Sequence, residues 1–182
     1  DYGALQPRLY KYAGFEIRPR TIRQYKIPIA PHILGTIREV NKKDIERDSY
    51  YQSGDYTGDL GVEKSYESYL RGRKGKQILL RDAHGRIKGH FEDGRYDISP
   101  IPGRDLTLSI DADLQAYAES LMVNKVGAVV AIQPSTGEIL CMVSSPTFDP
   151  RLLVGRQRGR NYRALSANPY RPLYDRAVSA TY

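Results

Sequence analysis

The sequence has few of the residues that build disulfides and metal sites. Among its 182 residues there are one cysteine, Cys141, and three histidines. A single cysteine excludes an internal disulfide framework, and three scattered histidines disfavour a dedicated zinc site. We therefore expect the chain to bind no metal and no cofactor.

Long hydrophobic runs are missing as well. The longest, residues 127–132, has the length of a buried strand, whereas a bilayer-spanning helix needs roughly 18 apolar residues. The chain opens on Asp1-Tyr-Gly-Ala, without an initiator methionine or a signal-peptide pattern, so we expect a piece of a longer protein. Because 40% of its residues are hydrophobic, it can still bury the core of one ordinary domain or two small ones.

Basic charge is concentrated near the C-terminus. The net charge is +7, yet residues 1–150 are almost neutral, with 21 basic and 20 acidic side chains. Residues 151–182 hold seven arginines and one acidic residue, Asp175. Such a tail could meet phosphates, anionic lipids or an acidic polymer. The favoured interpretation is a solvated segment whose partner surface lies outside this chain.

Local patterns predict a mixed α+β chain. Apolar spacing predicts a helix that ends near residue 12 and is stopped by Gly14, and further helices over 42–48, 62–71 and 112–124. Asn41 and Asp111 are the expected N-caps, and Gly72 is the expected C-terminal cap. Extended chain is predicted over 15–27, 33–40 and 106–110, and hairpins over 77–91 and 127–143. Beyond Pro146 the chain is expected to be irregular.

The best internal linker is Ser99-Pro-Ile-Pro-Gly103. Two prolines and a glycine within five residues interrupt regular structure. This places the expected domain boundary between residues 1–103 and residues 104–182.

Two patterns superficially suggest ligand sites. Gly72-Arg-Lys-Gly-Lys76 lacks the spacer and the Ser/Thr of a phosphate loop, so we interpret it as a helix cap and a basic loop. His84 and His90 lie near acidic residues on a predicted hairpin, where a polar surface is the simpler interpretation. Neither pattern makes a convincing site.

A self-sufficient catalytic centre is also not evident. Cys141 lies within an apolar strand pattern, where it should pack as a small hydrophobe. No serine is followed three residues later by lysine, and Ser166-Ala-Asn168 is too short a match in an irregular segment. Glu63 and Glu67, one helical turn apart, could share a proton if both were buried, although solvated or arginine-paired carboxylates are commoner.

The order of several segments nevertheless resembles class B penicillin-binding proteins. The stretch from Gly58 to Gly75 is similar to their G-x-x-G-x-E-x-x-Y-E-x-x-L-x-G-x-x-G box, and residues 102–115 and 127–150 resemble the opening of their transpeptidase domain. Residues 20–25 and 30–35 look like the elongation-type branch, and residues 173–177 resemble its Leu-x-Asn-Arg-Ala stretch. The positions that carry the resemblance are Gly58, Gly61, Glu63, Tyr66, Glu67, Leu70, Gly72, Gly75, Asp111, Gln115, Pro134, Gly137, Glu138 and Arg176. Gln133 and Asp175 depart from the family pattern, which usually has an acidic residue and an asparagine there.

The resemblance implies an α+β pedestal (dimerisation-type) domain followed by the first strand, helix and hairpin of a transpeptidase domain. The nucleophilic serine would lie just beyond Tyr182, so this portion would scaffold and bind partners, without catalysing. The parent protein would cross-link peptidoglycan stem peptides at the periplasmic face of the inner membrane and react with β-lactams. Its implied partners are a SEDS-type glycan polymerase and periplasmic scaffold proteins, and no nucleic acid.

The resemblance also implies an Arg-Gly box, absent here, whose arginine pairs with the glutamate at the position of Glu63. We therefore expect Glu63 to be more exposed, or to pair with another cation such as Arg38. Because the apolar hairpin over 127–143 has open edges, residues 104–182 are expected either to pair between chains or to be poorly ordered. The alternatives are a stand-alone basic binding module, which would need basic and aromatic residues on one face, and a catalytically inactive regulatory paralogue.

Overall fold

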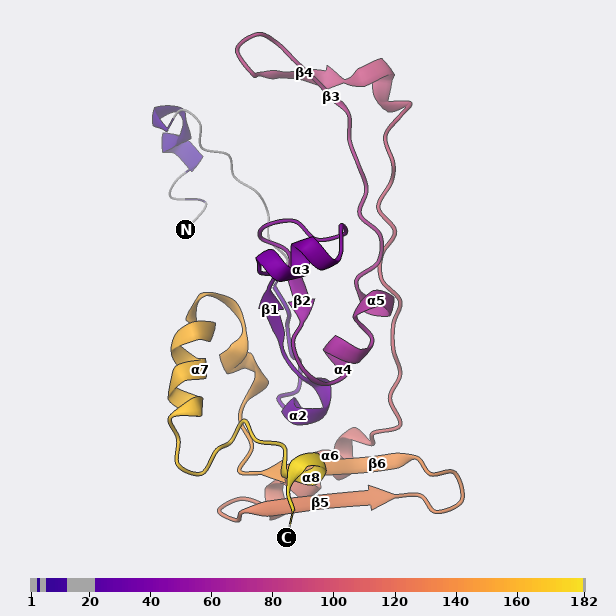
Figure 1. The fold of residues 1–182 in the computed structure, drawn as a ribbon, viewed down its shortest axis with the longest axis vertical. Helices are drawn as coiled ribbons and strands as arrows, with labels where there is room; N and C mark the ends of the chain where they lie inside the picture. Colours follow the sequence, from indigo (N-terminus) through magenta and orange to yellow (C-terminus); the bar gives the residue numbers. More distant parts are fainter. Residues whose placement is uncertain (1–2, 4–5, 13–21, 182) are drawn as a thin grey trace.

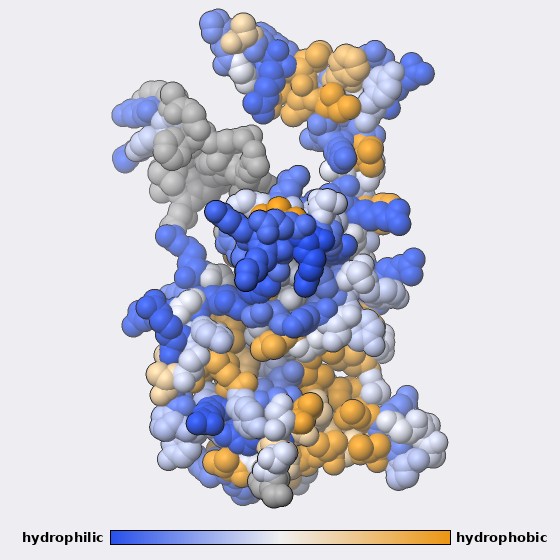
Figure 2. All heavy atoms as spheres, in the orientation of Figure 1, coloured by the Kyte–Doolittle hydropathy of each residue, from blue (hydrophilic) through white to orange (hydrophobic). Residues whose placement is uncertain are grey.

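The computed structural model describes residues 3, 6–12 and 22–181. Figure 1 shows an elongated molecule with a hairpin arm at one end, a group of short elements in the middle and a longer hairpin at the other end. Within the described residues, the strands form three separate two-stranded antiparallel sheets. Figure 2 shows apolar side chains gathered at both ends of the molecule, with polar side chains over the middle.

The N-terminal segment is described only in part. A 3-10 helix, η1 (Gln6–Lys11), occupies the stretch for which an α-helix was predicted. Gly14 and most of the extended chain expected over residues 15–27 lie outside the described residues. Residues 22–25 run as extended chain, but without pairing as a strand.

The middle of the molecule, which we call the platform, is built from six short elements. They are α2 (Pro31–Leu34), β1 (Ile37–Glu39), α3 (Lys42–Arg47), β2 (Tyr56–Gly58), α4 (Gly61–Ser65) and α5 (Glu67–Leu70). β1 and β2 pair with Ile37 opposite Gly58. The predicted α3 is confirmed, because the Asn41 side chain accepts from Asp44 N while Asp44 accepts from Asn41 N.

Two platform predictions need correction. Residues 33–40 are half helix and half strand: the chain turns at Ala30, and Pro31 then begins α2, a position where proline is favoured. The helix expected over 62–71 is broken at Tyr66, whose φ of −111° and ψ of 18° are not helical. Periodicity could not show this break, because it depends on how α5 packs on β2.

The distal arm is a hairpin on two extended chain segments. β3 (Leu79–Arg81) pairs with β4 (Ile87–His90), which confirms the predicted hairpin, and η2 (Phe91–Gly94) follows. The linker expected over residues 99–103 forms no helix or strand, although isolated bridges join Arg73 to Ile101 and Lys76 to Ile98. The prolines are tolerated here because the bridges use the N–H groups of Ile98 and Ile101.

The C-terminal portion packs a helix on the longest hairpin. α6 (Ala112–Leu121) covers β5 (Gly127–Ile132) and β6 (Ile139–Ser145), which confirms the predicted capped helix and hairpin. Ala118, Cys141 and Val143 form the buried core between them. Cys141 is 1% exposed and packs as a small hydrophobe, as predicted.

Two other predictions for this portion are wrong. Residues 106–110 alternate in hydropathy but form no strand, because a ladder needs a neighbouring strand; Ser109 Oγ and Asp111 N donate singly to Ile139 O and Leu140 O. The chain beyond Pro146 is not irregular throughout. It forms η3 (Pro150–Leu153), η4 (Gly155–Gln157), α7 (Arg158–Ser166) and α8 (Arg176–Ser179).

Candidate functional site

The glycines of the box over residues 58–75 lie where backbones touch. A Cβ on Gly58 would lie 2.2 Å from Glu63 O, and one on Gly75 would lie 2.6 Å from Ile98 O. Gly61 and Gly72 also have positive φ angles of 62° and 67°, which favour glycine. These four positions therefore fix the path of the chain from β2 through α4 and α5 into the distal arm.

Glu67 ties α5 to β2. One carboxylate oxygen accepts from Gly58 N at 2.8 Å, and the other accepts from the Tyr51 hydroxyl at 3.0 Å. The Tyr51 hydroxyl also lies 3.1 Å from Thr57 Oγ1 inside the protein. Glu67 therefore serves as a structural acceptor that joins α5 to β2 and to the segment before it.

Arg71 closes the other side of this network. It donates to Asp48 at 2.6 Å and lies 4.1 Å from the centre of the Tyr50 ring, while the Tyr50 hydroxyl donates to Arg71 O at 3.0 Å. The bond from Arg71 holds the pKa of Asp48 below its ordinary value. The box is therefore attached to the segment that precedes β2 by charge as well as by packing.

Glu63 is buried, with 7% of its surface exposed, and forms an ion pair with Arg23. Of the two alternatives expected for Glu63, greater exposure is wrong, whereas pairing with another cation is confirmed; that cation is Arg23 and not Arg38. Arg38 instead makes a bidentate pair with Asp44 at 2.6 and 3.0 Å and donates to Asp59 at 3.1 Å. The bonds from Arg38 lower the pKa of Asp44 well below its usual range.

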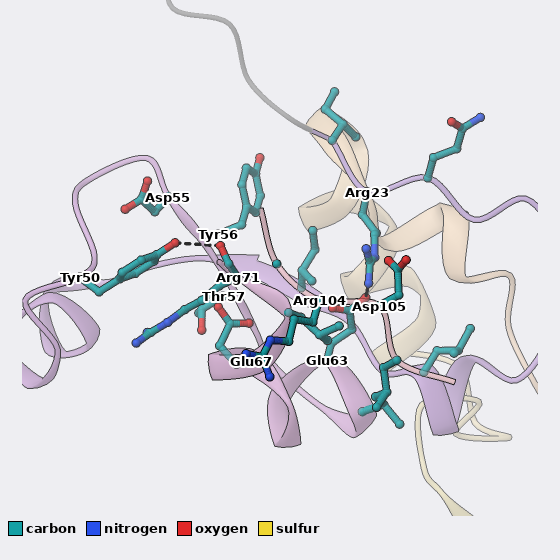
Figure 3. Close-up of a pocket in the computed structure, with 18 of the residues that line it drawn as sticks. Arg23, Tyr50, Asp55, Tyr56, Thr57, Glu63, Glu67, Arg71, Arg104 and Asp105 are labelled. Carbon is teal, nitrogen blue, oxygen red and sulfur yellow. Dashed lines mark hydrogen bonds and ion pairs between the residues drawn. The ribbon is translucent and has the colours of Figure 1, made fainter. Parts of the chain in front are cut away.

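An open groove of about 960 Å³ runs past these residues. Figure 3 shows Arg23 and Glu63 pointing toward each other, with Arg104 and Asp105 of the returning chain nearby. Both charge signs line the groove, together with tyrosines. Glu63 and Glu67 have separate partners, an arginine for Glu63 and neutral donors for Glu67, so the arginine-paired interpretation of such carboxylates describes Glu63.

The platform meets the C-terminal portion at three places. Ala30 N donates to Glu119 of α6 at 2.7 Å, and His32 Nε2 donates to Pro172 O at 2.8 Å. Arg158 donates to Ile37 O at 3.0 Å, and also to Asp59 at 3.1 Å. We call this set of contacts the junction. One arginine of the basic tail therefore has its partner surface within the chain.

The remaining predicted positions shape the C-terminal portion. Asp111 caps α6 by accepting from the N–H groups of residues 113 and 114. Gln115 is fully buried, and its amide bonds both backbone groups of Met142 in β6, at 2.9 and 3.0 Å. Arg176 donates to the carbonyl oxygens of residues 170, 171 and 174 and so shapes the loop before α8.

Pro134, Gly137 and Glu138 belong to the turn between β5 and β6. Gly137 has a φ of 76° and its N–H donates to Gln133 O at 2.8 Å, as a tight turn requires. Glu138 accepts from Thr136 Oγ1 at 2.9 Å. In the box, the two residues not yet placed lie at the surface: Tyr66 is 47% exposed and Leu70 is half-buried.

The weaker ligand patterns do not converge on a site. Among the residues that the structure describes, no cluster of three His, Cys, Asp or Glu side chains could hold a metal ion. His90 pairs with Asp97 at 2.6 Å, away from any such cluster. The basic stretch over residues 72–76 is extended chain bridged to residues 98–101, and Ser166 is an exposed residue at the end of α7.

Sequence reasoning missed four residues of this network, namely Arg23, His32, Glu119 and Arg158. Each finds its partner between 40 and 140 residues away along the chain, so no local spacing identifies it. The helix predicted over residues 112–124 did include Glu119, four residues after Gln115, and this spacing was the available signal that the two side chains meet. In the part of the chain described, no helix has the length and apolar run of a bilayer-spanning helix.

The fold and the site can now be compared with known proteins: a platform with a short two-stranded sheet and a glycine-rich box is followed by a hairpin that a helix covers. Residues 1–108 match the family model described as the Penicillin-binding Protein dimerisation domain. Because this match covers more than half of the chain, the chain belongs to that family, and its α+β fold and recognised motifs agree with it.

Particular relatives can be named. The peptidoglycan D,D-transpeptidase MrdA of Acinetobacter baumannii is 40% identical over 177 residues, covering 95% of this chain and 26% of the relative. The complex between PBP2 and MreC from Helicobacter pylori matches with a TM-score of 0.79 and 28% identity, covering 96% of this chain and 33% of that one. A peptidoglycan synthase complex that coordinates polymerization and crosslinking matches with a TM-score of 0.69 and 30% identity, covering 96% and 33%.

The chain spans about a quarter of the length of the curated relatives it matches. The activity of the relatives is therefore a statement about those longer proteins.

Proposed function

We propose that this chain is the non-catalytic support of a peptidoglycan transpeptidase of the elongation type, together with the start of its catalytic domain. Residues 1–103 form the non-catalytic pedestal, and residues 104–182 begin the domain that carries the chemistry. The observation that supports this most is the junction, in which α2 and β1 of the platform bond to three separate parts of the C-terminal portion. Contacts at three separate places restrict the movement of one part of the chain on the other.

The chemistry itself is assigned to the parent protein. In the proposed parent protein, the nucleophilic serine attacks the penultimate D-alanine carbonyl of a stem peptide. The bond to the terminal D-alanine breaks, that D-alanine leaves with a proton, and the acyl-enzyme is resolved by an acceptor amine, which forms the new peptide bond and frees the serine. Among the residues that the structure describes, the candidate groups are engaged elsewhere: Cys141 is buried, and the carboxylates of Glu63 and Glu67 are bound by their own donors. Position is its contribution: a reacting group misplaced by about 1 Å can cost roughly 100-fold in rate.

The partners follow from the same reasoning. One structural neighbour is PBP2 bound to MreC, and another belongs to a peptidoglycan synthase complex. We propose that the platform and the distal arm of this chain bind a periplasmic scaffold protein of the MreC kind and a SEDS-type glycan polymerase, at the periplasmic face of the inner membrane. The apolar side chains at the end of the distal arm, such as Ile87 at 53% exposed, offer such a surface.

Intact mass measured before and after incubation with a penicillin tests the assignment of the chemistry. We expect the chain to stay at 20.6 kDa without an adduct, and the parent protein to gain one penicillin. An adduct on this chain would show that Ser166 or Cys141 is a real nucleophile. A parent protein that never reacts would favour a catalytically inactive regulatory paralogue.

A further inference from the structure

Ala30 begins α2 in an unusual backbone conformation. Its φ of 52° and ψ of 42° are left-handed, a conformation that is strained for a non-glycine residue. Ala30 is 5% exposed, and its N–H donates to Glu119 Oε1 at 2.7 Å. The carboxylate of α6 therefore helps to hold a strained start of α2 in place.

Glu119 is in turn fixed to the hairpin. The same oxygen accepts from Gln115 Nε2 at 2.8 Å, and the Gln115 amide bonds both backbone groups of Met142. A buried side-chain amide that pairs like a strand leaves little freedom to α6 on β6. The path from β6 to α2 therefore runs through Gln115 and Glu119.

A second path leaves α2 on its other side. His32 Nε2 donates to Pro172 O, and the His32 ring lies edge-on to Phe148 with ring centres 5.3 Å apart. Two residues later the loop returns to β6, where Ser144 Oγ donates to Tyr174 O at 3.0 Å and accepts from Arg176 N at 2.9 Å. The contacts thus close a ring from β6 through α6, α2 and residues 172–176 back to β6. We call it the junction ring.

We propose that Glu119 and His32 are positioning residues that couple α2 to residues 172–176 through the junction ring. A displacement of α2 by a partner bound to the platform would then loosen or tighten the segment that leads to the C-terminal end of this chain. The proposal rests on the proposed function for its biological meaning, since that segment is the one expected to lead to the nucleophile. The coupling itself is a property of this chain alone.

Hydrogen exchange on the 182-residue chain tests the coupling. Glu119→Ala removes the acceptor of Ala30 N, so we expect amide exchange to rise roughly fivefold both in α2 and around residues 174–179, the effect of one lost hydrogen bond. Glu119→Gln keeps an acceptor oxygen and should restore most of the protection. Glu138→Ala, which removes an exposed glutamate from the β5–β6 turn, is the matched control and should leave both regions unchanged.

A variant at the other end of the junction ring distinguishes coupling around the ring from a local loss of structure at α2. Ser144→Ala removes the loop's bonds to β6 and touches no hydrogen bond of α2. Coupling free energies are mutual, so this variant should also raise exchange at residues 33–35, whose N–H groups bond Ala30 and Pro31. Exchange at the distal arm, for example at Phe91, reports global unfolding and should stay constant.

Three outcomes would overturn the proposal. They are a Glu119→Ala effect confined to α2, a Ser144→Ala effect confined to residues 172–179, or a rise at Phe91 equal to that at the ring. If Glu119→Ala does not fold, His32→Phe serves in its place, with His84→Phe on the exposed hairpin turn as its control. The penicillin experiment is independent of these results, so either idea can fail alone.

Discussion

At the scale of single residues, buried polar groups rather than apolar ones connect the platform. Glu63, Asp44 and Glu67 are each held by an arginine or by converging donors, and burial without such partners would be costly. His32 differs from these carboxylates because its contact needs no charge. One ring nitrogen donates to Pro172 O, and a neutral imidazole can make that hydrogen bond.

The pKa of His32 predicts how stability depends on pH. Burial lowers this pKa below its ordinary value of 6.5, and this outweighs the bond to Pro172 and the charges of Asp175 and Glu119 that raise it, while Arg176 lowers it further. The unfolded chain therefore binds the proton more readily. Stability is fully present above pH 6.5 and falls as the pH drops below it.

Urea unfolding of the wild-type chain between pH 7.5 and roughly pH 5 checks this expectation. The midpoint should fall with pH, and His32→Gln should flatten the curve, whereas His84→Gln should not. The paired aspartates titrate in a separate window, because their pKa values lie below the ordinary 3.8. An unchanged pH dependence in His32→Gln would contradict the prediction.

At the scale of elements, α6 and β6 are joined by a side-chain amide that hydrogen-bonds the backbone of β6 as a neighbouring strand would. Gln115 is fully buried and satisfies both the N–H and the C=O of Met142. Backbone groups that lose a buried partner keep the cost of having left water. The helix is therefore fixed in register on the hairpin, which apolar packing by Ala118 and Val143 could not achieve alone.

Gln115→Leu should lower the free energy of unfolding by about 2–4 kcal/mol, since two backbone groups lose their partners at once. Chemical denaturation measures the loss. Gln157→Leu makes the same change at an exposed position in η4 and should stay within about 0.5 kcal/mol of wild type. Equal losses in both variants would mean that the substitution acts through the residue type and not through the bond to β6.

At the scale of the whole molecule, the two ends differ from the middle in what they expose. The β5–β6 sheet has only two strands, and Val129, Val130 and Ile132 are 37%, 44% and 55% exposed. An apolar sheet with open edges is a pairing surface for another chain. The distal arm is similarly apolar, whereas the platform between them is covered by charge.

We therefore predict that the chain associates at micromolar concentration through β5. Light scattering should give a mass above 20.6 kDa, and Val130→Lys should shift it toward the monomer. Leu60→Lys, at a residue of the platform that is 55% exposed, should leave the association unchanged. A monodisperse wild-type monomer would remove the β5 edge as a pairing surface.

The features that could be predicted from the sequence are those whose interacting groups lie close together along the chain. The capping box at Asn41, the Asp111 cap and the β5–β6 turn were predictable, because their donors and acceptors lie within four residues. The strand expected over residues 106–110 failed because alternation cannot supply a neighbouring strand. The bridge from Ile101 to Arg73 was not predictable, because the two residues are separated by the whole distal arm.

By itself, the sequence determined the local elements, the family and the burial of Cys141, since composition, caps and motif order are properties of short stretches. Tertiary structure alone decided which arginine meets Glu63, how Glu119 reaches Ala30 across 89 residues and how His32 reaches Pro172 across 140. Such contacts exist only once the chain between them has closed, and the entropy of that closure is balanced by packing over the whole molecule. No local pattern contains that balance.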